Sequence, residues 1–304
     1  MRIEIFLALL MIPFYWLCLF NHAFVVSGLC LDDQRSLLLQ LKNNVTFSSK
    51  SRRKLKSWNP SHDCCRWIGV FCDNEGRVIG LDLSGELIRD GFDDSSAVFS
   101  LQFLQKLNLA SNNFNSVFPS GFNKLERLTY LNLSYSGFVG QIPIEISQLT
   151  RLVTLDISSL SYLTGKTLKL ENPNLSKLVQ NLSSIRQLYL DGVSISAAGH
   201  EWCSALLSLH DLQELRMCHC NLSGPLDPSL ATLENLSVIV LDQNNLSSPV
   251  PEKFAHWKKL TILSFSNCGL NGTFPQGIFR IGTLSVIDIS FNNNLHGFFP
   301  DFPQ

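Results

Sequence analysis

The amino-acid sequence predicts an α/β solenoid in which each repeat adds one short strand to a long parallel sheet. The first observation is a nine-residue frame, LxxLxLxxN, with its central residue at Leu107, Leu131, Leu155, Leu188, Leu215, Ile239, Leu263 and Ile287. The second is the spacing, because five of the seven steps between these residues are 24 residues long. A fixed period in the twenties is typical of a leucine-rich-repeat solenoid. We therefore predict a right-handed solenoid whose parallel concave sheet of about nine strands runs from residue 78 to residue 292.

The first 28 residues are typical of a signal peptide. Arg2 precedes an apolar run from Phe6 to Phe20, and the small residues Ser27 and Gly28 follow. The run is shorter than the roughly 20 residues that a membrane-spanning helix needs, so we predict a cleaved leader over 1–28. The chain would then enter the secretory pathway, with the plasma membrane as its destination if full-length and the extracellular space as given.

The composition excludes some classes of partner and suggests a glycoprotein. A net charge of −1 gives no reason to expect nucleic acid or anionic lipid as a partner. Only 16% of the residues are charged, against about 25% in ordinary domains. Asn-x-Ser/Thr sequons, which we predict as N-glycosylation sites, occur at Asn44, Asn132, Asn174, Asn181, Asn221, Asn235, Asn245 and Asn271.

Residues 29–77 precede the repeats and are predicted to form an N-terminal cap. A stack of repeats exposes the apolar face of its first strand, so a covering module is physically required there. Leu37, Leu38, Leu39 and Leu41 give one apolar helical patch. The residues expected to cover the first strand are Leu55, Trp58, Trp67, Ile68 and Val70. The repeats themselves are assigned to 78–304.

Four cysteines lie in the cap, and they indicate an oxidising compartment. Cys64 and Cys65 are adjacent and cannot easily bond each other, so pairing with Cys30 and Cys72 is favoured. A Cys65–Cys72 bond would close a short loop and a Cys30–Cys64 bond a longer one, contributing about 2.5 and about 4 kcal/mol in the chain-entropy model. A zinc site built from these thiols and His62 is the alternative, and an exported protein favours disulfides.

The cysteines within the repeats are predicted to be structural. Cys220 and Cys268 occupy the ninth frame position, which turns inward and holds asparagine in other repeats. Cys218 should face outward while Cys220 faces inward, so chelation of a metal by Cys218 and Cys220 is not expected. Cys203 lies in a convex insertion and has Cys218 and Cys220 as alternative partners. The two long steps place extra chain at 160–181 and 192–208, read as convex helices or loops, or alternatively as a specificity insert.

The frame also predicts which side chains cover the concave sheet. Side chains alternate along a strand, and parallel strands stack about 4.8 Å apart, so residues one repeat apart become neighbours. A polar cluster beside an apolar strip results, and we predict ligand binding by Tyr189, Glu214, Arg216, Val238, Val240, Asp242 and Ile262. The alternative is a solvated sheet face with no partner. A glycan on Asn132, on the same face, would direct protein contacts to the later repeats.

Catalysis finds little support in the sequence. His200 and Glu201 lack the second histidine of HExxH, and neither a phosphate-binding glycine loop nor GxSxG occurs. We therefore predict a non-enzymatic protein without cofactor or metal. The basic run at 52–56, with Arg52, Arg53, Lys54 and Lys56, is interpreted as a solvated face of a cap helix.

Two sets of motifs carry a family resemblance. The stretch LKSWNPSHDCCRWIGVFC at 55–72 resembles the N-terminal cap of plant extracellular leucine-rich-repeat proteins. Turns resembling LxGxIP follow the strands at 138–143, 222–228, 270–275 and 295–300. The segment 170–206 narrows the resemblance to receptor-like proteins of the kind that confer Verticillium wilt resistance. Together with the cysteine spacing, the family resemblance implies the disulfide pairs Cys30–Cys64 and Cys65–Cys72.

The resemblance implies two alternative functions. The first is the recognition module of a plant immune receptor-like protein, which binds a protein, peptide or glycan ligand and signals through a membrane receptor kinase as co-receptor. The second is a secreted inhibitor similar to the polygalacturonase-inhibiting proteins. Receptors of this kind continue with more repeats, a second cap and a membrane helix. Because the last of about nine repeats is open and no C-terminal cap precedes Gln304, we expect an incomplete product rather than a complete short protein.

Overall fold

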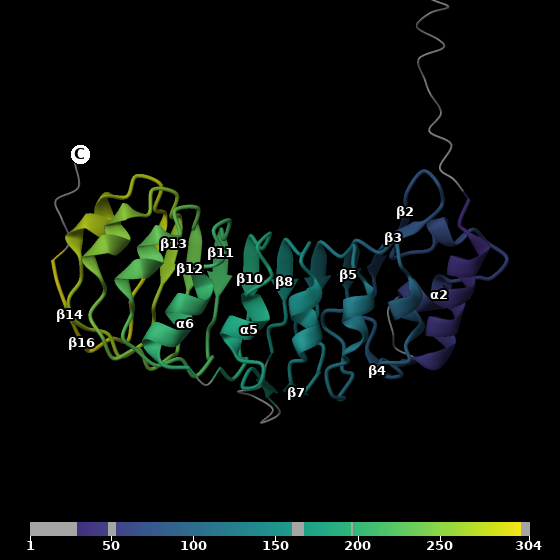
Figure 1. Ribbon diagram of the computed structural model, residues 1–304, viewed down its shortest axis with the longest axis horizontal. Helices are drawn as coiled ribbons and strands as arrows, with labels where there is room; N and C mark the ends of the chain where they lie inside the picture. The colour runs from purple at the N-terminus through teal and green to yellow at the C-terminus, as the bar shows by residue number, and fades with distance from the viewer. Residues whose placement is uncertain (1–28, 48–52, 160–166, 196, 299–304) are drawn as a thin grey trace, which may run out of the picture.

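The computed structural model describes residues 29–47, 53–159, 167–195 and 197–298, so the predicted signal peptide lies outside the described residues. One sheet runs the length of the solenoid (Figure 1). Its strands, in spatial order, are β2 (Val70–Cys72), β3 (Val78–Asp82), β5 (Lys106–Asn108), β6 (Tyr130–Asn132), β8 (Thr154–Asp156), β10 (Gln187–Tyr189), β11 (Glu214–Arg216), β12 (Val238–Val240), β13 (Ile262–Ser264) and β15 (Val286–Asp288). Strand β2 runs antiparallel to β3, and the later strands are parallel to one another. The predicted solenoid with a parallel sheet is confirmed.

The predicted register is also confirmed. Leu107 pairs with Leu131, Leu131 with Leu155, and Ile239 with Leu263 across neighbouring strands. These side chains are fully buried. The frame leucines therefore point into the core, and the residues between them point to the opposite face of the sheet.

Short helices lie on the side of each coil opposite the sheet, as Figure 1 shows for α5 and α6. Most are single 3₁₀ turns: η2 (Ala97–Ser100), η3 (Gly121–Lys124), η4 (Ile144–Gln148), η5 (Pro228–Thr232), η6 (Glu252–His256) and η7 (Gln276–Arg280). The two long steps hold α5 (Leu175–Val179) and α6 (Gly199–Leu206) instead. This agrees with the predicted convex helices, although part of the first insertion, 160–166, lies outside the described residues.

Three small two-stranded ladders fasten the flanks of the coils. They are β1 (Thr46–Phe47) with β4 (Ile88–Asp90), β7 (Gly140–Gln141) with β9 (Leu168–Lys169), and β14 (Asn271–Thr273) with β16 (Asn294–His296). Among the described residues, no helix has both the length and the apolar character needed to cross a membrane.

The cap consists of α2 (Asp32–Asn44), α3 (Arg53–Ser57) and η1 (Cys64–Arg66). Leu38 and Leu41 of α2 are buried, and Trp58 stacks on Trp67 with ring centroids 5.2 Å apart. Ile68, however, does not cover the first strand as predicted, because its side chain is 50% exposed. The chain is extended at Trp67, so Trp67 points inward and the next side chain points outward. The Ile68 carbonyl still accepts the Trp58 indole N–H at 3.1 Å.

The two predicted cap disulfides are present. Cys30 is bonded to Cys64 and Cys65 to Cys72. The sulfurs of Cys30, Cys64 and Cys65 lie within 4.8 Å of one another, a spacing that metal ligands also show. Their bonding as disulfides removes the thiolates that the alternative zinc site needs.

The prediction that the basic run 52–56 is simply solvated is wrong for Lys54. The Nζ of Lys54 donates to Asp82 Oδ1 at 2.8 Å and to the carbonyl and hydroxyl of Ser84, both at 3.1 Å. Behind it, the buried Glu86 carboxylate accepts the backbone N–H groups of Lys54 and Leu55, each at 3.3 Å. These bonds attach α3 to the first repeat. The Arg52 side of the run lies outside the described residues.

The ninth frame position forms a buried polar ladder, as predicted. Asn244 donates to the carbonyls of Met217 and Leu241 and accepts the N–H groups of Cys220 and Leu222. Cys220 and Cys268 fill the same position in their repeats and donate their S–H to the carbonyls of Leu190 and Leu241, at 3.0 and 3.1 Å. Both thiols are therefore structural.

The proposed pairing of Cys203 with Cys218 or Cys220 is not seen. Cys203 is buried in α6 as a free thiol, and Cys218, Cys220 and Cys268 are free as well. Burial raises the pKa of Cys203 to about 12 and that of Cys268 to about 11, so both are uncharged thiols at neutral pH.

Candidate recognition surface

The parallel register brings the predicted ligand-binding residues together. Tyr189 lies beside Arg216, and Arg216 beside Val240, on β10, β11 and β12. Glu214 lies beside Val238, and Val238 beside Ile262. Asp242 lies two residues beyond the end of β12. We call these seven residues, on four adjacent strands and their ends, the mid-face patch.

The polar half of the patch is held by a chain of hydrogen bonds. The Thr154 hydroxyl donates to Gln187 Oε1 at 2.7 Å, and Gln187 Nε2 donates to Glu214 Oε1 at 2.9 Å. The Tyr189 hydroxyl donates to the other carboxylate oxygen of Glu214 at 2.6 Å. Burial, and then this bond to Glu214, raise the pKa of Tyr189. The phenol is therefore protonated and oriented at neutral pH. Gln187 and Thr154 are absent from the predicted patch, although the frame places both in the Glu214 column.

Arg216 is the freest charged group of the patch. Its Nε donates to Asp191 Oδ2 at 3.2 Å, while Asp191 Oδ1 accepts the Cys218 N–H at 2.8 Å. Burial alone lowers the pKa of Arg216, but the Asp191 carboxylate outweighs it and the net shift is upward. The side chain is still 44% exposed. A positioned guanidinium with open N–H groups is suited to a carboxylate or carbonyl of a ligand.

The apolar strip differs from the prediction at one residue. Val238 and Ile262 are half-buried, and Val286 on the next strand is 46% exposed. Val240 is only 5% exposed, so it supports the strip from below instead of offering contact surface. The neighbours of Val240 on the next strands are Arg216 and Ser264, and the long Arg216 side chain is able to cover it.

Asp242, within the patch, and Asp156, beside Tyr189 on β8, are acidic groups in different surroundings. Asp242 Oδ1 accepts the Ser264 hydroxyl at 2.7 Å and the Ser266 N–H at 2.8 Å, so it also ties two repeats together. Burial raises the pKa of Asp156, and the charge of Asp191 adds to the shift. The frame predicts that the Asp156 side chain points outward, but its partial burial could not be inferred from the frame.

The sequons divide by exposure and by face. Asn44, Asn174, Asn181, Asn221 and Asn245 are exposed. Asn235 and Asn271 are half-buried, as is Asn132 on the concave strand β6. The Asn132 amide nitrogen donates to the Tyr130 hydroxyl at 3.2 Å, and its oxygen accepts from Ser134. Glycosylation at these positions stays a prediction.

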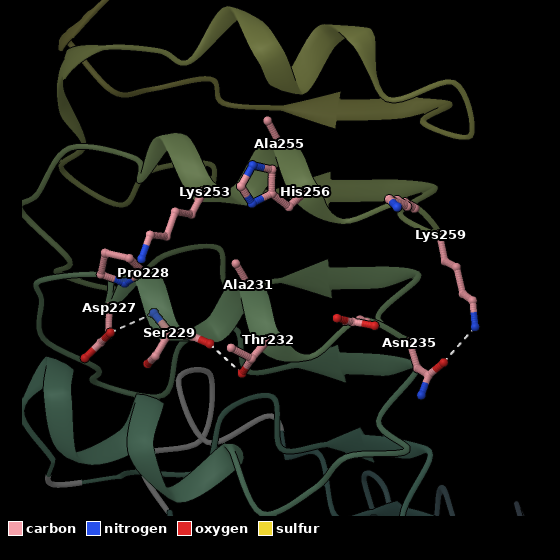
Figure 2. Close-up of a pocket in the computed structure, with 12 residues that line it drawn as sticks. Asp227, Pro228, Ser229, Ala231, Thr232, Asn235, Lys253, Ala255, His256 and Lys259 are labelled. Atoms are coloured by element: carbon pink, nitrogen blue, oxygen red, sulfur yellow. Dashed lines mark hydrogen bonds between the residues drawn. The ribbon is translucent and has the colours of Figure 1, made fainter.

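A furrow of about 1120 Å³ lies on the convex side (Figure 2). It lies between η5 and η6, with Ala231 and Ala255 on its floor. Lys259 donates to Asn235 Oδ1 at 2.7 Å at one margin. Charges of both signs line the furrow, with Asp227 and Glu234 among three lysines.

Comparison with known families assigns the repeat type. A model described as leucine rich repeat N-terminal domain matches residues 31–73. Models described as leucine rich repeat match 102–160, 211–233 and 259–281.

Curated relatives and a solved structure extend the match across most of the chain. Receptor-like protein 6 of Arabidopsis thaliana is 31% identical over 286 residues, 88% of this chain and 28% of that protein. Receptor-like protein Cf-9 of Solanum pimpinellifolium is 33% identical over 246 residues, 75% of this chain and 27% of that protein. The ectodomain of the Arabidopsis thaliana receptor kinase GASSHO1/SCHENGEN3, solved in complex with CASPARIAN STRIP INTEGRITY FACTOR 2, is 27% identical with a TM-score of 0.70; the match covers 88% of this chain and 30% of that one. The chain thus spans less than a third of the length of these relatives.

Proposed function

We propose that this chain, which belongs to the leucine-rich-repeat proteins and is homologous over most of its length to plant receptor-like proteins, is an extracellular recognition module of plant immunity. It binds a pathogen-derived or wall-derived ligand through the mid-face patch. Signalling passes to a membrane receptor kinase that serves as partner. The module itself catalyses no reaction.

The observation that carries the proposal is the preorganised polar cluster on the concave face. Tyr189 and Glu214 are fixed by a 2.6 Å hydrogen bond, and Arg216 projects beside them with open donors. The half-buried Val238 and Ile262 give apolar ground next to these groups. Tyrosine and arginine over apolar surface are enriched in binding hot spots. The GASSHO1/SCHENGEN3 ectodomain, which has the same fold, was solved with a bound partner, and this supports a binding role for the fold.

The experiment is a calorimetric titration of the secreted chain with candidate extracellular peptides and oligosaccharides. Replacing a true anchor, by Arg216→Ala or Tyr189→Ala, should cost about 2 kcal/mol of binding, roughly thirtyfold in Kd. Arg280→Ala on the convex turn η7 is the matched control, because Arg280 is exposed and far from the sheet face. It should leave Kd unchanged.

Two outcomes would contradict this placement. Equal affinities for both anchor variants and the unmodified chain would remove the mid-face patch as the site. Loss of binding on changing the 160–181 insertion would move the site to the convex side. Inhibition of a polygalacturonase by the chain, without ligand capture, would favour the inhibitor function instead.

A further inference from the structure

A second hollow lies on the concave face at the cap end of the sheet, and strand β8 separates it from the mid-face patch. It has a volume of about 420 Å³ and is lined mainly by carbon atoms. Pockets for small ligands typically measure about 300 to 1,000 Å³. The register places Phe71, Gly80, Lys106 and Tyr130 side by side on β2, β3, β5 and β6. We call these four residues the cap-end hollow.

The hollow exists because β3 has a glycine, Gly80, at the strand position where the later strands have a side chain. Every later strand places a side chain at this position, from Lys106 and Tyr130 to Val286, whereas β3 has Gly80. A Cβ on Gly80 would lie 3.1 Å from the Phe71 Cβ and 3.2 Å from its Cδ2. Glycine is therefore the residue that lets Phe71 stand over the strand. Phe71 is nevertheless 57% exposed, so its ring is a wall of the hollow and not part of the core.

The opposite wall is a fixed aromatic ring. The Tyr130 hydroxyl accepts the amide N–H of Asn132 at 3.2 Å, which orients the phenol. The hollow thus has an aromatic ring at each end, with Gly80 and Lys106 between them in the register. Each ring is suited to contact with a flat, apolar side chain, because aromatic rings gain energy from stacked and edge-to-face packing.

The charge in the hollow is positive, because Lys106 stands between Gly80 and Tyr130 in the register. The Lys106 side chain is exposed and makes neither an ion pair nor a hydrogen bond with the residues that the structure describes. The acidic neighbour Asp82 is already bound to Lys54 at 2.8 Å and to Ser84. A ligand carboxylate in the hollow could therefore pair with the Lys106 ammonium, and the Asp82 carboxylate beside it is already paired.

We propose that the cap-end hollow is a peptide subsite that binds an aromatic side chain between Phe71 and Tyr130 and pairs an adjacent carboxylate with Lys106. The proposal deepens the recognition function, since it adds a sequence preference that the mid-face patch does not supply. The subsite is proposed for the chain without a glycan on Asn132, because the Asn132 amide nitrogen lies 3.2 Å from the Tyr130 hydroxyl and a glycan there would crowd the hollow.

The test uses the full secreted chain and a synthetic probe, an acetylated and amidated hexapeptide with phenylalanine followed by aspartate in a glycine background. Saturation-transfer NMR at millimolar peptide should show magnetisation transfer from the protein to the phenylalanine ring. A titration followed by NMR chemical shifts gives Kd. Phe71→Ala should raise Kd about fivefold through loss of ring packing. Because Phe71 is largely exposed, the variant should fold, and circular dichroism checks this.

A charge-swap comparison tests the role of Lys106. Lys106→Glu should weaken the phenylalanine-aspartate peptide about fivefold and leave a phenylalanine-asparagine peptide almost unchanged. Lys124→Glu, an exposed lysine on η3, is the matched control and should change neither. Equal effects of the two lysine variants would overturn the assignment of Lys106.

Other outcomes separate this subsite from the mid-face patch. No transfer to the phenylalanine ring, or the same transfer in Phe71→Ala, would overturn the subsite while leaving the Arg216 titration valid. Arg216→Ala should keep full affinity for the hexapeptide, so failure of the proposed function and failure of the subsite give different results.

Discussion

At the residue scale, one frame position shows how the environment sets the behaviour of a repeated side chain. Asp82, Asn108, Asn132 and Asp156 all use Oδ1 to accept the N–H two residues later, at 2.9 to 3.1 Å. Aspartate and asparagine therefore satisfy the same turn at the end of the strand. The negative charge of aspartate is not needed for this turn, and its effect on stability depends on the neighbouring side chains.

Asp156→Asn should stabilise the protein at neutral pH. Burial raises the pKa of Asp156 in the folded chain above its unfolded value, so its contribution to stability is lost as pH rises through the folded pKa. The amide keeps the turn and removes the buried charge. We expect Tm to rise by about 2 °C at pH 7 and the gain to vanish once pH falls below the unfolded aspartate pKa of about 3.9, as measured by calorimetry.

Asp82→Asn is the matched opposite case. Burial alone would raise the pKa of Asp82, but the bonds from Lys54 and Ser84 outweigh it, and the pKa lies below its usual value. This stabilisation is present above the unfolded pKa and is lost as pH falls through the folded one. Removing the charge should lower Tm by about 3 °C at pH 7 and by less in acid. A loss of the same size in Asp156→Asn would show that the turn, and not the charge, governs both sites.

At the element scale, the polar ladder at the ninth position joins each strand to the next coil. Asn244→Ala should cost about 3 kcal/mol, because buried backbone groups of Met217, Leu241, Cys220 and Leu222 lose their partner. Urea unfolding followed by circular dichroism measures the change. Cys268→Ala, at the same position one repeat later, should cost only about 1 kcal/mol since a thiol is a weak donor. Similar losses in both variants would mean that packing, and not hydrogen bonding, stabilises the ladder.

The cap disulfides should differ in their contribution to stability. Their sequence separations are 34 and 7 residues. In the chain-entropy model, removing Cys30–Cys64 by paired serine substitutions should therefore cost about 4 kcal/mol, and removing Cys65–Cys72 about 2.5 kcal/mol. Thermal unfolding of the two double variants gives the comparison. A larger loss for the shorter loop would contradict the entropic account.

At the scale of the whole molecule, the two ends of the sheet are not equivalent. At the cap end, β3 is paired with β2, and α2 packs on η2 with Leu38 and Leu41 buried. At the far end of the described sheet, Leu284, Ile287 and Ile289 are only half-buried, whereas their counterparts one repeat earlier, Leu260, Leu263 and Phe265, are fully buried.

Hydrogen exchange should therefore be fastest at β15 and slow progressively through β13 and β12. Each repeat packs only on its neighbours, so opening propagates from the less covered end. Exchange of the Val286 amide, bonded to the Thr261 carbonyl at 3.0 Å, should exceed that of the Ile262 amide, bonded to Ser237 at 3.1 Å. Mass spectrometry of exchanged fragments measures this. Equal protection at both ends of the sheet would argue for a single cooperative unit.

The sequence by itself determined the architecture. A 24-residue period repeats the same inward and outward alternation, so the register, the buried leucines and the neighbours within the mid-face patch all follow from the frame. The cap and its two disulfides followed from spacing and from the family resemblance. The cap and its disulfides are local features, whereas the register and the buried leucines recur in each repeat.

Only the tertiary structure decided the environment of individual side chains. It buried Val240, exposed Ile68, left Cys203 unpaired and joined Lys54 to Asp82. It also gave Asp82 and Asp156, at one frame position, opposite pKa shifts. The physical reason is that burial and charge depend on side chains from the neighbouring strands about 4.8 Å away and from the cap. The frame predicts on which face of the sheet a side chain lies. The identity of its neighbours is not predicted, because they lie at variable positions of other repeats, where the sequence is not periodic.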